Sequence, residues 1–499
     1  MYWLGLDIGT GGSRAVILDA QGREAGAASA AHEDILMQRP LWAEQRPENW
    51  AEAAFEAIRR ALVTAGIAGK QIRGVALSGQ MHGLVLLDRA RQVIRPALIW
   101  CDQRSQPQVD WINHRVGAAT ALQYTANPVL TGFTLPKLLW VRDHEPANFD
   151  RVWHVLLPKD YVRLCLTSEL ATDVSDASGT AMFDVVRRRW SFEMMDRVGL
   201  DSSILPRVHE STEITGTLSA SAAALTGLAE GIPVAAGGGD QAASAVGNGV
   251  VEPGLVSCTL GTSGVVFAHM ERVSYDPLGR VHTFCHAVRD KWHVMGVTQG
   301  AGLSLQWFRN QFAPGVLYDD LMAEAAQSPA GARGLYWLPY LMGERTPHLD
   351  ASARAAWVGL TAKHTRADLI RALIEGVAYS QKDCLDLVAA RGVEIASVRA
   401  SGGGARSRVW RQILADVFGK PVVTLASQEG SALGAAILAM VSTGQYSSVA
   451  EASRAIVRET ECLEPRPDEV STYAAGHAVY RSLYPALKPL FPAMQVDIA

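Results

Sequence analysis

The sequence predicts an α/β protein of two domains with a cleft between them, and three observations support this prediction. The chain has 499 residues, more than a single hydrophobic core usually serves. Two glycine-rich turns, 7–13 and 260–264, each lie between two apolar runs that read as strands. In both halves strands and helices then alternate, with further glycine-rich turns where strands end, which is typical of α/β folds.

The two glycine-rich turns have the composition of phosphate-binding loops. A Gly-Thr turn between two strands exposes backbone N–H groups and a hydroxyl, and both suit an oxyanion. The residues concerned are Thr10, Gly11, Gly12 and Ser13 in the first turn and Gly261 and Thr262 in the second. Because the turns lie far apart in the chain, they suggest two related halves that hold one polyphosphate.

The first half begins with a strand hairpin and continues through a helix. Pro47 at its start, with Trp50, Ile58 and Leu62 on one face, predicts a helix over 48–65. The other elements expected here are strands at 2–6, 15–18, 72–77, 84–87, 97–100 and 152–157 and a helix at 135–141.

The second half starts near Pro233. Its expected elements are strands at 234–236, 255–260, 265–268 and 398–400 and helices at 303–311, 366–389, 406–418 and 431–441. We expect two domains, 1–240 and 241–499, with the last helix of the chain as a candidate to pack back on the first domain.

Composition excludes several classes of protein. The net charge is −4, from 46 basic and 50 acidic residues, so there is no basic footprint for nucleic acid. The six cysteines are scattered without a CxxC pair, which is typical of reduced thiols. The charge-free stretches 116–136 and 430–450 are broken by polar residues, Gly or Pro, and the N-terminus is unlike a signal peptide. We therefore expect a cytoplasmic protein without membrane or nucleic-acid partners.

Two aspartates at strand ends are candidates for phosphate chemistry. Asp7 lies beside the first glycine-rich turn, where it could hold Mg²⁺ through water between itself and bound phosphates; the alternative is an aspartate that caps the turn. Asp240 follows three glycines and could accept a proton from a substrate hydroxyl; the alternative is an ordinary turn aspartate.

Polar and aromatic residues at other strand ends suit a sugar. Met81 and His82 lie in the loop 79–83, and Trp100 could lie against the C–H face of a sugar, although both His82 and Trp100 could also be structural. His282, Cys285 and His286 suggest zinc, but neighbours on a strand point to opposite faces and no fourth ligand is visible, so we favour a structural role.

Other nucleotide and hydrolase motifs are missing from the chain. There is no GxxxxGK[ST] loop, no GxGxxG in the context of a dinucleotide fold and no GxSxG elbow.

With these motifs in place, the chain resembles the FGGY carbohydrate kinases, which have the sugar kinase/actin/Hsp70-type fold of two RNase H-like domains. The resemblance is carried by DIGTGGSRA (7–15), GFTLPKLLWVRDH (132–144) and WVGLTAKHTRADLIRALIEG (357–376). Within the family, the segments most similar to those of xylulose kinases are LWAEQRPENW (41–50), SGQMHG (78–83), LLPKDYVRL (156–164), SDASGT (175–180), GGGDQAA (237–243), HTFCHA (282–287), GERTPH (343–348) and SGGGARS (401–407).

The resemblance implies a role for each site residue. Asp240 would be the general base, and Asp7 would organise Mg²⁺. The residues that would bind ATP are Thr10, Gly11, Gly12, Ser13, Gly261, Thr262, Gly302, Gln306, Gly403, Gly404 and Arg408. The residues that would line the sugar pocket are Met81, His82, Trp100, Asp240 and Gln241.

The implied reaction is ATP-dependent phosphorylation of D-xylulose to D-xylulose 5-phosphate, by in-line transfer to the C5 hydroxyl. Gln241 stands where xylulose kinases often carry Asn, so D-ribulose, L-ribulose and glycerol are alternative substrates. A non-catalytic actin-like ATPase is an alternative of another class. A sugar-sensing regulator would need a DNA-binding module, and the chain has no basic N-terminal extension to supply one. The expected partners are a small sugar and ATP, and a homodimer is compatible with the sequence.

Overall fold

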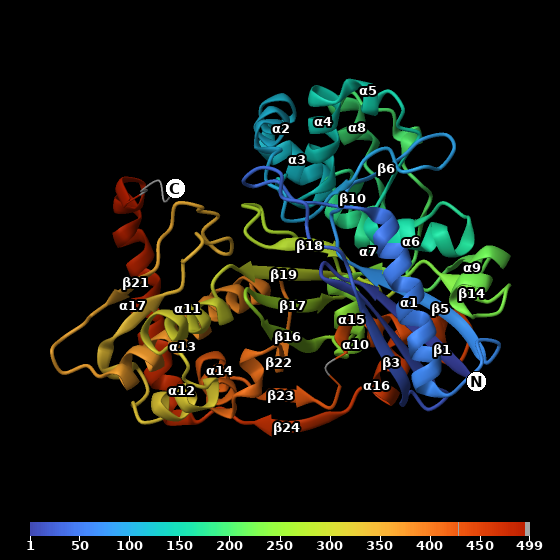
Figure 1. The fold of residues 1–499 in the computed structure, drawn as a ribbon. Helices are drawn as coiled ribbons and strands as arrows, with labels where there is room; N and C mark the ends of the chain where they lie inside the picture. The colour runs from blue at the N-terminus through green and yellow to red at the C-terminus, as the bar shows by residue number, and fades with distance from the viewer. Residues whose placement is uncertain (428, 495–499) are drawn as a thin grey trace.

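A computed structural model describes residues 1–427 and 429–494, and within them the chain forms two seven-stranded sheets, one in each half (Figure 1). The first sheet has the order β13-β14-β5-β1-β2-β3, with β15 also on β5; its strands are β1 (Tyr2–Ile8), β2 (Gly12–Asp19), β3 (Glu24–Ala31), β5 (Ile72–Gly79), β13 (Ile214–Thr217), β14 (Pro233–Ala235) and β15 (Gly238–Gly239). The second has the order β18-β19-β17-β16-β22-β23-β24; its strands are β16 (Gly254–Leu260), β17 (Gly264–Met270), β18 (His282–Cys285), β19 (Trp292–Thr298), β22 (Ile395–Ser401), β23 (Val422–Leu425) and β24 (Glu459–Leu463).

The centre of each sheet repeats the same unit. In the first, β1 pairs antiparallel with β2 and parallel with β5. In the second, β16 pairs antiparallel with β17 and parallel with β22. Each glycine-rich turn therefore joins a hairpin whose first strand lies at the middle of a sheet. The α/β class and the two related halves predicted from the sequence are confirmed.

Helices cover the sheets, and short strands link the loops. The helices are α1 (Pro47–Ala65), α2 (Gln106–Ile112), α3 (Ala118–Thr125), α4 (Thr134–His144), α5 (Pro146–Phe149), α6 (Pro158–Thr167), α7 (Val174–Ala177), α8 (Phe192–Val198), α9 (Ala220–Thr226), α10 (Asp240–Gly247), α11 (Gly302–Phe312), α12 (Tyr318–Ala325), α13 (Arg366–Ala389), α14 (Arg408–Phe418), α15 (Gly430–Ser442), α16 (Val449–Ile456) and α17 (Pro467–Leu487). The short strands are β4 (Glu44–Gln45), β6 (Val85–Leu87), β7 (Ala97–Leu98), β8 (His154–Leu156), β9 (Thr172–Asp173), β10 (Phe183–Asp184), β11 (Arg189–Trp190), β12 (Val208–His209), β20 (Tyr336–Leu338) and β21 (Ala356–Val358). In the described residues no helix combines the length and the apolar character that crossing a membrane requires.

The prediction for the last helix is wrong, because a different helix from the second half covers the first sheet. The tyrosines Tyr473, Tyr480 and Tyr484 of α17 are buried in the core of the second half, and Figure 1 shows α17 on its far side. It is α15, apolar on all sides, that packs on β1, β5 and α10 (Figure 1). The indole Nε1 of Trp3 donates to Thr443 Oγ1 at 2.7 Å just after this helix.

Glycines allow α15 to lie in direct backbone contact with its neighbours. A Cβ on Gly434 would lie 1.8 Å from the carbonyl oxygen of Ala243 in α10. A Cβ on Gly5 of β1 would lie 2.1 Å from the carbonyl oxygen of Ala432 in α15. Because α10 begins at Asp240, this packing also fixes the position of a candidate catalytic residue.

We predict that Gly434→Ala destabilises the protein. The new methyl would overlap the Ala243 carbonyl, and overpacking of this kind costs about 2 kcal/mol or more, which corresponds to a fall of roughly 5 °C in melting temperature. Gly403→Ala is the matched control, because a Cβ there meets nothing within 4 Å and its φ of −60° suits alanine. Equal melting temperatures for the two variants in thermal denaturation would contradict the packing argument.

Candidate active site

Three strands of the first sheet end side by side and bring together the two aspartates. β15 pairs parallel with β5, which pairs parallel with β1, so their carboxyl ends lie at one edge of the sheet. Asp7 is opposite Ser78, and Gly238 is opposite the same Ser78 from the other side. Asp240 follows β15 directly. Asp7 and Asp240 therefore flank the end of β5, from which the loop with Met81 and His82 begins.

Asp240 is partly accessible to solvent. It is the first residue of α10, and Gln241 beside it is part-exposed. Burial, together with the negative charge of Asp7, raises the pKa of Asp240 to about 7, against the effect of Gln241. A carboxyl with a pKa near 7 can take up a proton and release it at neutral pH.

Asp7 has the character of a ligand for a cation. Burial raises its pKa to about 6; the neighbouring Ser78 lowers it, and the charge of Glu429 raises it. Its Oδ1 atom is buried without a hydrogen-bond partner among the described residues. A carboxylate oxygen in this position suits a hydrated divalent cation such as Mg²⁺, so the residues present fit the metal that the sequence predicts.

A buried lysine anchors the turn before Asp240. Lys159 Nζ lies 2.6 Å from Asp160 Oδ1 and 2.9 Å from Asp173 Oδ1. The second oxygen of Asp173 accepts from Ser175 Oγ at 2.5 Å, and Ser175 Oγ accepts from the Gly239 N–H at 3.1 Å. Burial alone would lower the pKa of Lys159, but the carboxylates around it raise its pKa above the ordinary value. The charged network therefore fixes the backbone on which Asp240 is mounted.

The loop with His82 is held equally firmly. His82 has a φ of +71°, and its Nδ1 lies 2.7 Å from the carbonyl oxygen of Gly179. Because burial lowers the pKa of His82 to about 3, the ring is neutral; Nδ1 then carries the proton, and Nε2 is an acceptor. Its ring stacks on Phe133 at 4.7 Å, and its backbone carbonyl accepts from Lys137 Nζ at 3.1 Å.

Met81 contacts the turn before Asp240 directly. A Cβ on Gly239 would lie 2.8 Å from Met81 Cγ. Glycine at 239 therefore lets the predicted sugar loop and the predicted base approach each other.

Trp100 lies at the rim of the same region. Its side chain is 45% exposed, and its Nε1 donates to Thr10 Oγ1 at 2.9 Å. The Thr10 hydroxyl in turn donates to Gln80 Oε1 at 3.2 Å. The strand expected at 97–100 ends at Leu98, which leaves Trp100 in a turn with an exposed ring. One threonine thus connects the first phosphate turn, the loop with His82 and the tryptophan.

The predicted phosphate turns differ in which groups they expose. In the first, Gly11 is exposed and a Cβ on it would meet nothing within 4 Å, whereas Ser13 is buried with its Oγ 2.9 Å from His32 Nε2. Ser13 therefore supports the turn from behind. In the second, Gly261 accepts from the Gly302 N–H at 2.8 Å, so this turn is joined to the start of α11, one turn before the exposed Gln306.

A cavity of about 670 Å³ adjoins both turns. Asp7 and Arg14 line it from the first half, and Gly402, Arg406 and Arg411 line it from the second. Its volume is in the range of small-molecule sites. None of the residues predicted to bind ATP is among its lining residues; Gly403 and Gly404 neighbour Gly402, and Gly404 lies against Leu260 just before Gly261.

Sequence reasoning missed the arginines of this cavity. Arg14 and Arg406 lie within motifs already noted, DIGTGGSRA and SGGGARS, so the signal was present. Arg408, predicted instead, is exposed, donates to Glu461 at 3.0 Å and lines a different hollow with Arg371. Its nucleotide role stays a prediction.

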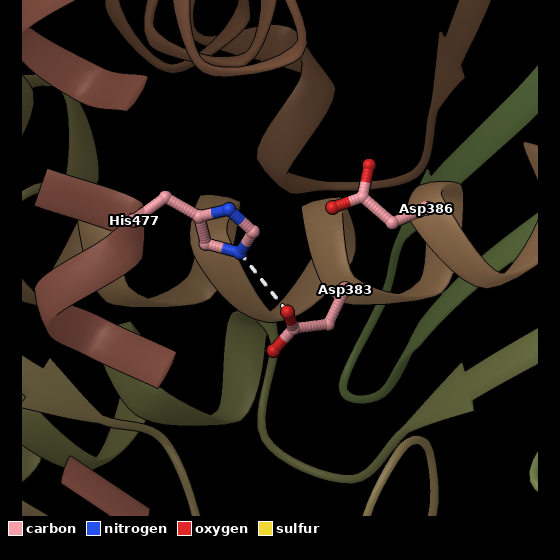
Figure 2. A group of neighbouring side chains, drawn as sticks. All are labelled: Asp383, Asp386 and His477. Atoms are coloured by element: carbon pink, nitrogen blue, oxygen red, sulfur yellow. Dashed lines mark hydrogen bonds and ion pairs between the residues drawn. The ribbon is translucent and has the colours of Figure 1, made fainter. Parts of the chain in front are cut away.

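A second cluster with metal-ligating groups lies away from the cleft. Asp383, Asp386 and His477 point toward one another (Figure 2). However, His477 Nε2 lies 3.0 Å from Asp383 Oδ1, Arg481 is 3.7 Å from the same oxygen, and Lys382 pairs with Asp386. Protein cations already balance these carboxylates, so the cluster is an ion-pair network.

We predict that Asp240→Asn stabilises the protein increasingly as the pH rises. The pKa of Asp240 is about 7 in the folded state and near 3.8 ordinarily, so the unfolded chain releases this proton first. The wild type therefore loses stability as the pH rises from about 4 to 7, by about 1–3 kcal/mol in total, and neutral Asn avoids this loss. Melting temperatures between pH 5 and 8 measure the effect; Asp196→Asn, an exposed aspartate on α8, is the control. If the difference in melting temperature between Asp240→Asn and wild type stays constant with pH, the prediction is refuted.

Comparison with known proteins shows the family of the chain. The model of the FGGY family of carbohydrate kinases, N-terminal domain, matches residues 2–247, and that of the C-terminal domain matches residues 256–443. The chain is 37% identical over 494 residues to the xylulose kinase of Bacillus subtilis, covering 99% of each chain, and 39% identical over 489 residues to that of Escherichia coli, covering 98% of this chain and 99% of the other. It superposes with a TM-score of 0.91 on a crystal structure titled as a xyloylose kinase from Brucella ovis, 38% identical, covering 98% of this chain and 100% of that one. The chain belongs to the FGGY family of carbohydrate kinases.

Proposed function

We propose that the protein transfers the γ-phosphoryl group of ATP to the C5 hydroxyl of D-xylulose, giving ADP and D-xylulose 5-phosphate. The observation that carries this proposal is the position of Asp240: a carboxyl with a pKa near 7, across the end of β5 from Asp7 and beside the loop with Met81 and His82. The xylulose kinases to which the chain is similar support the choice of sugar.

Asp240 serves as the general base. It accepts the proton of the C5 hydroxyl as the oxygen–phosphorus bond forms and the bond to the bridging oxygen of ADP breaks. The hydrogen bond from Gly239 to Ser175 and the network behind it hold the carboxyl in one place, which favours in-line geometry.

Asp7, whose Oδ1 has no hydrogen-bond partner among the described residues, would hold Mg²⁺ through water. Bound Mg²⁺ neutralises phosphate charge during the transfer. The negative charge of Asp7 opposes the ionisation of Asp240. A cation bound beside Asp7 would weaken this effect.

The nucleotide binds across the two halves. Arg14, Arg406 and Arg411 line the cavity, and Asp7 and Thr259 line it next to the two glycine-rich turns. The backbone N–H groups of these turns would bind the phosphates. Arg14 is paired with Glu429 from the start of α15, and the phosphates would compete for it. Closure of the halves around both substrates excludes water from the reaction.

The sugar lies between the loop at 79–83 and the start of α10. His82 Nε2 accepts a hydrogen bond from a sugar hydroxyl, and the exposed ring of Trp100 covers a C–H face. Gln241 adds an amide next to Asp240. Since Gln reaches one methylene further than Asn, D-ribulose, L-ribulose and glycerol are the competing substrates.

The first test is ADP release with MgATP across a panel of ketoses and polyols. We expect D-xylulose to give the highest kcat/KM. Asp240→Asn should lower kcat by about 10²–10⁴ while leaving ATP binding intact, and the exposed Asp196→Asn should behave as wild type. Stimulation by ribulose or glycerol alone would select those substrates; ATP hydrolysis unaffected by any sugar would favour an actin-like ATPase.

The second test is the pH profile of kcat/KM for the sugar. Because the base must be ionised, the rate should fall as the pH drops below the pKa of Asp240, about 7, approaching a tenfold loss per pH unit. The residual activity of Asp240→Asn should not show this fall at low pH. A wild-type profile that is flat from pH 5 to 8 would remove Asp240 from the role of base.

A further inference from the structure

Arg345 lies in a loop that is clamped on both sides of it. Glu344 Oε1 accepts from the backbone N–H of Gln299 at 2.8 Å and from that of Arg345 at 2.7 Å. On the other side, the Thr346 N–H donates to the Val297 carbonyl at 2.9 Å, and Thr346 Oγ1 accepts from the Val297 N–H at 3.1 Å. The loop is thus fixed to the end of β19, and the direction in which the Arg345 side chain leaves it is fixed as well.

The guanidinium group of Arg345 has no protein partner in the described part of the chain. Its side chain takes part in no hydrogen bond, ion pair or cation–π contact there, and Glu344 is engaged by backbone N–H groups. Burial lowers the pKa of Arg345, although the group remains charged. The guanidinium is half-buried and none of its nitrogens is fully enclosed, so its five N–H donors are available to solvent or to a ligand.

Strand β18 and the loop that carries Arg345 lie on the side of the second half that faces the predicted sugar loop. His282 and Phe284 of β18 contact the aromatic residues of the first half: the His82 and Phe284 rings are 6.2 Å apart, and the Phe133 and His282 rings 5.7 Å. The positive charge of Arg345 is close enough to contribute to the low pKa values of both His82 and His282. Arg345 therefore stands across from His82, on the second half of the molecule.

We propose that Arg345 is a sugar-binding residue, donating hydrogen bonds to oxygens of the sugar from the side opposite His82. Its planar fork of N–H donors fits two neighbouring oxygens, such as a hydroxyl and the adjacent carbonyl of a ketose. This inference rests on the proposed function, because it assumes a sugar next to His82. It adds a contact from the second half to a pocket otherwise built from the first half and the start of α10.

Glu344 is a positioning residue for the loop that carries Arg345. Burial raises its pKa to about 8, against the effect of the backbone N–H groups of Gln299 and Arg345 that it accepts from. Gln299 lies three residues before Gly302, where the second phosphate turn is attached. Glu344 therefore links the loop that carries Arg345 to the segment that leads to the second glycine-rich turn.

The test is direct binding of D-xylulose to the full chain without ATP, by calorimetry, for wild type, Arg345→Gln and Arg345→Lys. We expect Arg345→Gln to weaken sugar binding about tenfold or more and to raise the KM for the sugar, with the KM for ATP unchanged within about twofold. Arg345→Lys should recover part of the affinity, because it keeps the charge but not the fork. Arg366→Gln, which removes an exposed arginine paired with Glu324, is the control and should bind as wild type.

The melting temperature separates this role from a structural one. Since Arg345 has no protein partner, Arg345→Gln should melt at or above the wild-type temperature. If Arg345→Gln binds the sugar as tightly as wild type, or loses affinity for ATP and not for the sugar, the inference about Arg345 is overturned. The proposed function would be unaffected by either result. Absence of pentulose binding by the wild type would overturn the proposed function and this inference with it.

Discussion

The electrostatic repulsion between Asp7 and Asp240 is the constraint on which the rest of the site depends. Both carboxyls sit at the edge where three parallel strands end, and the charge of Asp7 adds to the effect of burial in raising the pKa of Asp240. Because the two carboxylates repel each other, the surrounding backbone must be rigid enough to keep Asp7 and Asp240 close together. The strand pairing fixes Asp7, and the Lys159 network and α10 fix Asp240.

The need for rigidity explains how the halves of the chain are interleaved. Although α15 comes late in the sequence, it packs on β1 and β5 and against α10. Its glycine contacts bring backbone against backbone, and side chains of α15 such as Leu433 and Ile437 pack around these contacts with Trp3 and Val246. The start of α15 also brings Glu429 to Arg14 and to the vicinity of Asp7. One helix of the second half thus sets both the mechanical support and part of the charge balance of the first.

Much of this could be predicted from the sequence, because local patterns define the elements and the turns. The helix 366–389 and the two hairpins were visible as periodic apolar runs, and Asp7 and Asp240 as acids at strand ends. Partnerships across the fold were not visible. Nothing local shows that Ser13 hydrogen-bonds behind its turn, or that Arg408 and Arg411 both pair with Glu461 while only Arg411 also lines the cavity. Likewise α17 and α15 are both helices with apolar surface, and only the shape of the facing sheet decides which one covers β1.

The residues left without partners indicate how binding and closure are linked. In the described residues, Asp7 Oδ1 on the first half lacks a hydrogen bond, and so does the guanidinium of Arg345 on the second. These groups have opposite charges but are not paired with each other. Each can be met by a ligand of complementary chemistry: a hydrated cation with its phosphates for Asp7, and sugar oxygens for Arg345. Because the two groups belong to different halves, the free energy gained on binding both substrates favours the arrangement in which the halves enclose them. Under the proposed function, an isolated phosphate donor would satisfy only one group, so full closure would require the sugar and would limit the transfer of phosphate to water.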